Sequence, residues 1–228
     1  FDSMTSIFPQ SLKNKSSQIV AGGEKLEEAR EIGIHGSRLY LATKEGILEV
    51  ETEKQSTTLV IKRDPDWGEI VDLFAYGGNL YLLDRGKNQI WKYIRTESGF
   101  SDKRNYLNRD VRPDFGKAAS FAIDGAIWVL YQDGEVLKFL QGRPEVFSLS
   151  GLDTPFSQPL AIFTSDETKN LYISDPAGKR IVVFEKSGSY LSQYLSEELG
   201  GAQELVADEE EKKIFVLSGN KIYGIELK

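Results

Sequence analysis

The chain has 228 residues, 40% hydrophobic and 28% charged, and its 28 Lys and Arg against 35 Asp and Glu give a net charge of −7 at pH 7. This composition excludes a disordered chain, and the length suffices for a core that needs no disulfide or metal. With no Cys and one His, thiolate nucleophiles, Cys-ligated zinc and multi-histidine metal sites are excluded. The acidic balance disfavours nucleic-acid binding by the whole surface, and no stretch approaches the about 18 consecutive apolar residues that span a membrane.

A short motif recurs five times: a polar or small residue, then an apolar, an aromatic and another apolar residue. The copies lie at 38–41, 79–82, 126–129, 170–173 and 213–216. Their first apolar residues are 41, 47, 44 and 43 positions apart. This period is that of a four-stranded propeller blade.

Each copy predicts the second strand, b, of a blade, because its consecutive apolar residues indicate burial on both faces. A run before the motif predicts strand a, and a run after a tight polar turn predicts strand c. Weaker edge strands, d, are predicted at 57–61, near Tyr106, at 145–149 and at 190–194, with single helical turns at 24–31 and 192–199. In chain order, strands within 6–21 precede blades at about 30–61, 69–107, 118–149, 159–194 and 203–227.

The two ends of the chain predict how the last blade is completed. Residues 7–20 align with 47–60 at a constant offset of 40, which indicates strands c and d, whereas the C-terminal copy stops after its strand c. We therefore expect residues 18–21 to supply the missing d strand, which closes five blades and removes two exposed edges. The alternative is a six-bladed ring whose first blade lacks strands a and b upstream of Phe1. Either way, residues 1–228 are expected to form one monomeric propeller domain, excised from a larger protein.

Two of the blades carry a recognisable pattern. Residues 170–175, an apolar-aromatic-apolar run that ends in Asp, are followed by Lys179, Arg180 and a second apolar run, and residues 79–93 are similar. This pattern resembles NHL-type propeller repeats, although the other three copies lack the Asp or the Arg. The chain also resembles propeller regions at the C-terminal end of larger bacterial proteins, some of them membrane-anchored. The resemblance implies a binding role rather than an activity, and it leaves open a cytosolic or an extracytoplasmic location.

In propellers the b–c turns and the d–a connections lie on one face, which commonly carries the site. Asp84 and Asp175 both end a strand b, where a carboxylate can accept backbone N–H bonds across the turn, and they are also the weak candidates for metal ligands. Arg180 is expected to bridge carboxylates of the neighbouring blade. The candidates for the binding face are Trp67, Asp84, Arg85, Arg109, Arg112, Asp133, Asp175 and Arg180.

Two segments on this face have unusual composition. Asp64, Asp66 and Trp67 surround a Pro, which favours either half of a calcium site, a sugar-stacking platform, or a rigid turn with Trp67 packed against the next blade. Residues 92–117 carry 7 basic and 4 acidic side chains with Tyr106 and Phe115 among them. That mixture suits single-stranded nucleic acid or an acidic peptide, and it equally suits a solvated insertion.

Two functions from different classes follow from these residues. The first is a non-enzymatic module that binds a protein or a small ligand, with Trp67, Arg85, Arg109 and Arg112 as the main contacts, since such residues dominate interface energetics. The second is a metal-dependent hydrolase or lactonase in which Asp84, Asp133 and Asp175 converge on the central channel. A sensor domain for a catalytic domain elsewhere is a third option. No cofactor and no nucleic-acid partner are predicted, and the sequence favours the non-enzymatic module.

Overall fold

The structure is a computed structural model that describes residues 5–6, 29, 31–54, 56–219 and 221–227. Within them the strands form five four-stranded antiparallel sheets and one two-stranded sheet. The chain divides into two compact units. We call residues 17–116 the two-blade unit, and residues 1–16 together with 117–228 the three-blade unit, and we describe each by itself.

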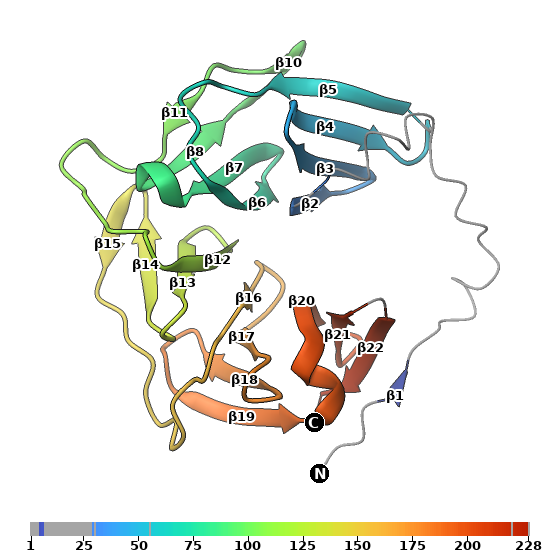
Figure 1. Cartoon of the computed structure of the whole chain (residues 1–228), viewed down its shortest axis with the longest axis vertical. Helices are drawn as coiled ribbons and strands as arrows, with labels where there is room; N and C mark the ends of the chain where they lie inside the picture. The colour runs from blue at the N-terminus through green and yellow to red at the C-terminus, as the bar shows by residue number, and fades with distance from the viewer. Residues whose placement is uncertain (1–4, 7–28, 30, 55, 220, 228) are drawn as a thin grey trace. The chain divides into compact units, whose positions relative to one another are not determined.

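The two-blade unit holds the first two sheets in chain order (Figure 1). The first consists of β2 (Glu31–His35), β3 (Arg38–Thr43), β4 (Gly46–Glu51) and β5 (Ser56–Lys62). The second consists of β6 (Ile70–Tyr76), β7 (Asn79–Asp84), β8 (Gln89–Tyr93) and β11 (Arg104–Asn105). The 3-10 turn η1 (Arg85–Lys87) joins β7 to β8, and the hairpin of β9 (Arg95–Thr96) and β10 (Gly99–Phe100) lies between β8 and β11 in the chain.

The three-blade unit holds the other three sheets. The third sheet consists of β12 (Ala118–Ile123), β13 (Ile127–Tyr131), β14 (Val136–Leu140) and β15 (Arg143–Glu145). The fourth consists of β16 (Ala161–Phe163), β17 (Asn170–Asp175), β18 (Arg180–Glu185) and β19 (Tyr190–Leu195). The fifth consists of β20 (Ala202–Asp208), β21 (Lys213–Ser218), β22 (Lys221–Glu226) and β1 (Thr5–Ser6).

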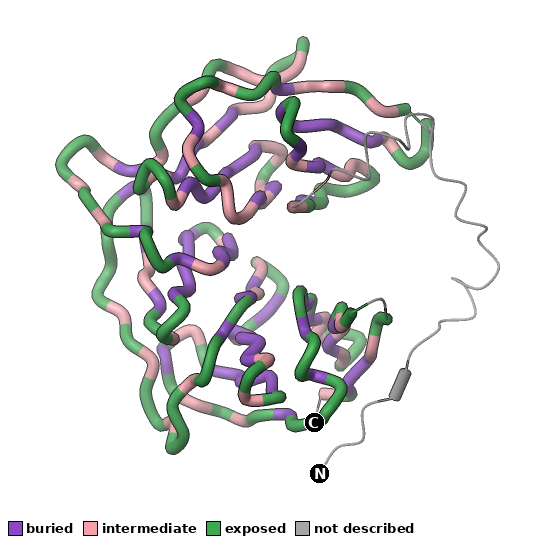
Figure 2. The backbone as a smooth tube through the Cα atoms, viewed as in Figure 1, coloured by how far each residue is buried: buried purple, intermediate pink, exposed green. Residues whose placement is uncertain are grey.

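The second strand of each sheet coincides with one copy of the recurring motif. Three of these strands are buried on both faces: all of β13 is buried, as are residues 80–84 of β7 and 171–175 of β17 (Figure 2). The other two, β3 and β21, are buried only in part. Consecutive burial is what the apolar-aromatic-apolar pattern predicts. The expected fold class, an all-β propeller of five four-stranded antiparallel blades, is confirmed.

Neighbouring blades pack through the side chains of these strands. In the two-blade unit one buried cluster joins Tyr40 and Ile47 of the first blade to Leu82 and Trp91 of the second, and it includes Trp67 from the connection between them. Burial of such apolar surface is the main stabilising term of the unit. Trp67 therefore helps to hold two blades together.

The outer strand of the third blade differs from its predicted position. It was expected at 145–149, but β15 covers Arg143–Glu145, and Val146 is fully exposed. The reason is the turn: Gln141 and Gly142 both have positive φ, 50° and 79°, as in the two-residue turns that connect adjacent antiparallel strands. The chain thus returns immediately after β14 ends. The d strand predicted near Tyr106 is β11, and the Tyr106 N–H donates to the Ile90 carbonyl at 2.8 Å.

The last blade is completed by an N-terminal strand, as expected, but not by the expected residues. The strand β1 pairs with β22, with Thr5 opposite Gly224 and Ser6 opposite Tyr223. The prediction had assigned this place to residues 18–21, because the offset of 40 aligned them with a strand d. Residues 7–28 lie outside the described part of the chain, so the strands predicted there and most of the turn predicted at 24–31 do as well.

Helical structure is limited to short turns. Of the turn predicted at 192–199, residues up to Leu195 belong to strand β19, and the turn itself is the 3-10 segment η2 (Glu197–Gly201). Leu199 in that turn is fully buried. None of the helical segments in the described residues has the length and apolar character needed to cross a bilayer.

Candidate functional site

Asp84 ends β7 and is completely buried. Its carboxylate accepts hydrogen bonds from the Gly68 N–H at 2.8 Å, the Lys87 N–H at 3.0 Å and the Trp91 indole N–H at 2.8 Å. These donors come from the β5–β6 connection, the turn after β7 and strand β8. Asp84 therefore ties three segments of the second blade together, as a turn-capping carboxylate does.

Asp175 holds the equivalent place at the end of β17. It accepts from the backbone N–H groups of Ser157 and Gln158, at 3.1 and 2.8 Å, and from Arg180 Nε at 2.9 Å. Arg180 was expected to bridge carboxylates of the neighbouring blade, but its ion pair is with Asp175 in the same sheet. The cause is register, since Asp175 and Arg180 are directly opposite on β17 and β18. The remaining N–H groups of Arg180 donate to the Gln193 side chain and to the carbonyls of Thr154 and Pro155.

Of the other candidates for the binding face, Trp67 is buried and is described below, and four lie at the surface. Arg85 forms a two-contact ion pair with Glu69. Arg109, Arg112 and Asp133 are exposed; Arg112 donates to the Val111 carbonyl, and Asp133 accepts from the Glu135 N–H. Their assignment to a binding face, like that of Asp84, Asp175 and Arg180, stays a prediction.

The basic stretch 92–117 uses part of its charge within the two-blade unit. Lys103 Nζ lies 2.8 Å from Asp64 and 3.3 Å from Asp66, and it also stands 4.7 Å from the Trp91 ring centroid. Because the Asp64 carboxylate accepts hydrogen bonds from Lys103 and from the Asp66 N–H, its pKa is lowered below its usual value. The two carboxylates of the 64–68 loop therefore face a lysine of their own unit.

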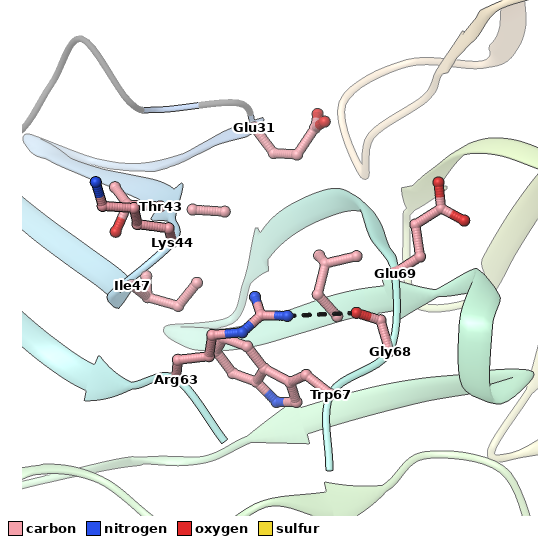
Figure 3. Close-up of a pocket in the computed structure, with 10 residues that line it drawn as sticks. Glu31, Thr43, Lys44, Ile47, Arg63, Trp67, Gly68 and Glu69 are labelled. Atoms are coloured by element: carbon pink, nitrogen blue, oxygen red, sulfur yellow. Dashed lines mark hydrogen bonds between the residues drawn. The ribbon is translucent and has the colours of Figure 1, made fainter. Parts of the chain in front are cut away.

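A cavity of about 370 Å³ opens in the two-blade unit, between the β3–β4 turn and the β5–β6 connection. We call it the Arg63–Trp67 cavity. Its apolar residues come from β3, β4, β6 and the β5–β6 connection, and its charged residues come from the start of β2, the β3–β4 turn and the same connection. The lining residues are Glu31, Ala42, Thr43, Lys44, Ile47, Arg63, Trp67, Gly68, Glu69 and Ile70 (Figure 3).

Trp67 forms one fixed wall of the cavity and is only 5% exposed. Its indole N–H donates to the Tyr93 hydroxyl at 2.9 Å, and the two rings meet edge to face with centroids 6.2 Å apart. Burial raises the pKa of Tyr93 well above its usual range, so the hydroxyl stays neutral. The alternative that packs Trp67 against the next blade is therefore the one that the contacts support.

Arg63 lies across Trp67, with its guanidinium carbon 5.9 Å from the ring centroid (Figure 3). One N–H group points at the Gly68 carbonyl at 3.5 Å, the outer limit for a hydrogen bond, and the side chain is exposed. Among the described residues it has no carboxylate partner. Arg63 thus presents an oriented cation to the cavity, in a stacked geometry that is typical of cation–π pairs.

The charges around the cavity do not cancel. Its lining has two cations, Lys44 and Arg63, and two carboxylates, Glu31 and Glu69. Glu69 is paired with Arg85, which holds the pKa of the Glu69 carboxyl below its usual value. With that pair counted as neutral, the lining carries one net positive charge, so the cavity favours a ligand with one negative charge.

The wall opposite Trp67 is held by the β3–β4 turn. The Thr43 hydroxyl donates to the Gly46 carbonyl at 3.0 Å and accepts from the Glu45 N–H at 3.2 Å. The backbone N–H of Arg63 donates to the Glu45 carbonyl at 2.8 Å. Gly46 has φ of +135°, and a Cβ there would lie 2.0 Å from the Ile61 carbonyl oxygen. Only glycine fits this approach, so Gly46 lets the start of β4 lie directly against β5 beside the cavity.

Sequence reasoning identified Trp67 but missed Arg63 and the rest of this lining. Trp67 stands out because it follows two Asp residues and a Pro. Arg63 is one of several basic residues near a strand end, and nothing in the sequence around it indicates that its guanidinium lies over the indole of Trp67. In the described part of the chain, no three or more His, Cys, Asp or Glu side chains gather in a way that would hold a metal ion.

A scan of protein-family models and a search of curated proteins give no match to this chain. Solved structures resemble it in fold. A gluconolactonase from Xanthomonas campestris has a TM-score of 0.61 and 14% identity, over 84% of this chain and 69% of that one. A streptogramin B lyase has a TM-score of 0.56 and 12% identity, over 100% of this chain and 73% of that one.

A third similar structure is PorZ, a surface component of the type-IX secretion system of Porphyromonas gingivalis. Its TM-score is 0.58 at 17% identity, and the match covers 94% of this chain but only 26% of PorZ. At these identities a structural likeness establishes the fold alone, since one fold hosts many functions. The comparisons therefore agree with the sheet topology: this chain has a β-propeller fold.

Proposed function

We propose that this chain is a non-enzymatic binding module, whose ligand is a small molecule or a short segment of a protein held in the Arg63–Trp67 cavity. The observation that carries the proposal is Arg63, an oriented cation that is stacked on a buried indole at the wall of a cavity of about 370 Å³. A mostly pre-formed cavity with an apolar surface and a few polar groups is the usual form of a ligand site. Its position between a b–c turn and a d–a connection is also the one that propellers commonly use.

The alternative is a metal-dependent hydrolase or lactonase, which the names of the gluconolactonase and the lyase neighbours bring into consideration. Its candidate ligands Asp84 and Asp175 each bind three or more donors of the chain with both carboxylate oxygens. A metal at either place would have to displace those bonds, and each blade would lose the link between its connection and its turn. We therefore favour binding over metal-dependent hydrolysis.

Three side-chain indole N–H groups make the proposal testable, since the chain has three Trp residues. Trp91 and Trp128 donate to the carboxylates of Asp84 and Asp124 and do not line the cavity, whereas Trp67 forms its wall. The three indole signals in a ¹⁵N–¹H spectrum are assigned with single Trp→Phe variants. A fragment set of acids, amines, sugars and nucleotides is then titrated against the labelled protein.

We expect at least one fragment to move the Trp67 signal saturably and to leave the Trp128 signal in place. The Trp91 signal is not used as a control, because its acceptor Asp84 also accepts from Gly68 of the lining. A set in which no fragment moves the Trp67 signal would contradict the proposal. The metal-dependent alternative is tested in parallel with calcium, magnesium, manganese and zinc. A saturable rise in melting temperature, together with lactone hydrolysis that Asp84→Asn or Asp175→Asn abolishes, would replace binding by catalysis.

The finer assignments from the sequence belong to the same proposal. We propose that the second and fourth blades are NHL-type repeats, that residues 1–228 work as one monomeric domain, and that the exposed Arg109 and Arg112 contact a protein partner. Light scattering of the purified chain tests the monomer. A pull-down with Arg109 and Arg112 replaced by Gln tests the partner, and retention of the same partner by that variant would remove these two residues from the interface.

A further inference from the structure

We infer that the ligand of the Arg63–Trp67 cavity carries a single carboxylate, which Arg63 binds, joined to a small apolar group. This inference deepens the proposed function and rests on it. It names the chemical class of the ligand, which the proposal leaves open.

The first step concerns the partners of two other arginines that lie over aromatic rings. Arg95 lies 4.9 Å from the Phe100 ring centroid and pairs with Glu49. Arg180 lies 5.6 Å from the Phe156 ring centroid and pairs with Asp175 at 2.9 Å. In both cases the guanidinium lies over an aromatic ring and pairs with a carboxylate, and a planar fork of N–H donors suits both contacts.

Arg63 shares the first half of this arrangement. Its guanidinium lies over the Trp67 ring. Among the described residues its N–H groups have one acceptor, the Gly68 carbonyl at 3.5 Å, and no carboxylate. A guanidinium has five N–H donors, so most of them are directed at the cavity and at solvent. At Arg95 and Arg180 the guanidinium has both an aromatic ring and a carboxylate as partners. A carboxylate from a ligand would give Arg63 the same two partners.

The second step is the charge of the ligand. The lining has one net positive charge when the Arg85–Glu69 pair is counted as neutral, and the Glu31 carboxylate also belongs to it. A monoanion matches this balance. A phosphate monoester, with a charge of about −1.5 to −2 at pH 7, would exceed the single net positive charge of the lining, so the cavity favours a carboxylate over a phosphate.

The third step is the rest of the ligand. Ala42 and Ile70, which are half-buried, line the cavity and Ile47 packs behind them, so part of the surface available to a ligand is apolar. A volume of about 370 Å³ is at the small end of ligand cavities. It fits a carboxylate with a branched aliphatic or a single aromatic group. A free organic acid and the carboxyl end of a peptide both present this chemistry.

The experiment uses the full chain and matched pairs of acids and amides. The probes are acetate, isovalerate and 3-phenylpropionate, each with its primary amide, plus inorganic phosphate. N-acetyl-Ala-Phe with a free or an amidated carboxyl end distinguishes the peptide source from the free acid. Binding is followed by the Trp67 indole signal, with wild type, Arg63→Gln and Lys62→Gln compared at one salt concentration.

Lys62→Gln is the matched control, because Lys62 is the adjacent residue, is also exposed and does not line the cavity. We expect at least one acid with an apolar group to bind saturably, and to bind at least tenfold more tightly than its amide. Arg63→Gln should weaken that acid at least tenfold and leave its amide unchanged, whereas Lys62→Gln should change neither. Equal melting temperatures of the three proteins confirm that the variants are folded.

The possible failures are distinguishable. If amides, amines or sugars move the Trp67 signal and no acid binds more tightly than its amide, the carboxylate inference is wrong and the binding module stands. If Arg63→Gln binds the acids as tightly as wild type, Arg63 is not the group that recognises them, and the inference is also wrong. If no compound of any class moves the signal, the proposed function fails with it.

Discussion

Two arginines, one in each unit, lie across an aromatic ring of a connection that leads into an a strand. Arg180 stacks on Phe156 before β16, and Arg63 stacks on Trp67 before β6. Arg180 is 4% exposed and donates to four residues of its own blade, whereas Arg63 is exposed and has one distant carbonyl. The same arginine–aromatic contact therefore serves folding at Arg180, where the chain supplies the acceptors, and in the function proposed above it serves binding at Arg63.

The difference between the two arginines is tested most directly by replacing each of them, in separate variants, with Gln. Arg180→Gln leaves the buried Asp175 carboxylate without its cation, and removal of one partner of a buried pair costs about 3–5 kcal/mol of unfolding free energy. Arg63→Gln removes an exposed side chain with one weak hydrogen bond, and should change the unfolding free energy by less than about 0.5 kcal/mol. Urea unfolding followed by circular dichroism measures both.

A loss of stability in Arg63→Gln as large as that in Arg180→Gln would show that Arg63 has a structural role, and would overturn the comparison. Asp133→Asn serves as the control for a turn carboxylate that is exposed. Its effect should fall in the range expected of Arg63→Gln.

A second variant tests the close approach of the chain at Gly46, beside the cavity. Gly46→Ala places a Cβ 2.0 Å from the Ile61 carbonyl oxygen at φ of +135°, so we expect a loss of at least about 2 kcal/mol. Gly36 also has positive φ, +58°, but open space around it, and Gly36→Ala should cost about 1 kcal/mol. Equal losses in the two variants would mean that the close approach at Gly46 contributes nothing, and the two unfolding curves decide this.

The hydrogen bond behind Trp67 gives a smaller effect. Tyr93→Phe removes the acceptor of the buried Trp67 indole N–H, so the unfolding free energy should fall by about 1–2 kcal/mol. A double-mutant cycle isolates this bond. In the Trp67→Phe background, which has no indole N–H to leave unpaired, the same change at Tyr93 should cost clearly less, and an unchanged cost would contradict the assignment.

The smallest effect concerns the ion pair of Asp64 and Lys103 beside the same loop. Because Lys103 lowers the pKa of the folded Asp64 carboxyl, the pair stabilises the fold at pH values above the pKa of the unfolded state, about 4. That contribution, under about 1 kcal/mol for a partly exposed pair, is lost as the pH falls through the lowered folded pKa. Wild type should therefore exceed Asp64→Asn in stability at pH 7 and match it near pH 2, and a constant difference between the two would contradict this origin.

The fold was largely predictable because burial on both faces leaves a direct trace in the sequence. Strand β17, for example, appears as Leu171, Tyr172 and Ile173 in succession, and all three are buried. Outer strands leave no such trace, since only one face packs. β15 was therefore placed too late, and the turn at Gln141 and Gly142 that fixes it depends on positive φ at a Gln, which sequence rules do not anticipate.

The candidate site was predictable only in part, for a physical reason. Trp67 stands out by residue type. The cavity, however, lies where the β3–β4 turn meets the end of β5, and the backbone N–H of Arg63 donates to the Glu45 carbonyl there. That contact joins residues 18 positions apart. The internal roles of Asp84 and Asp175 were anticipated, since a carboxylate at a turn commonly accepts backbone N–H bonds, whereas the donors to them from the preceding connection required the structure.

The pairing of β1 with β22 has a consequence for the order in which the protein can mature. More than two hundred residues separate these two strands, so at about 5–20 residues per second β22 leaves the ribosome about 10–40 seconds after β1. During that time four blades can already form, while the last one waits for both ends of the chain. A nascent chain therefore carries β1 without its partner, and a chain that lacks β1 exposes the edge of β22, which is the edge at which we expect strand exchange with a second copy.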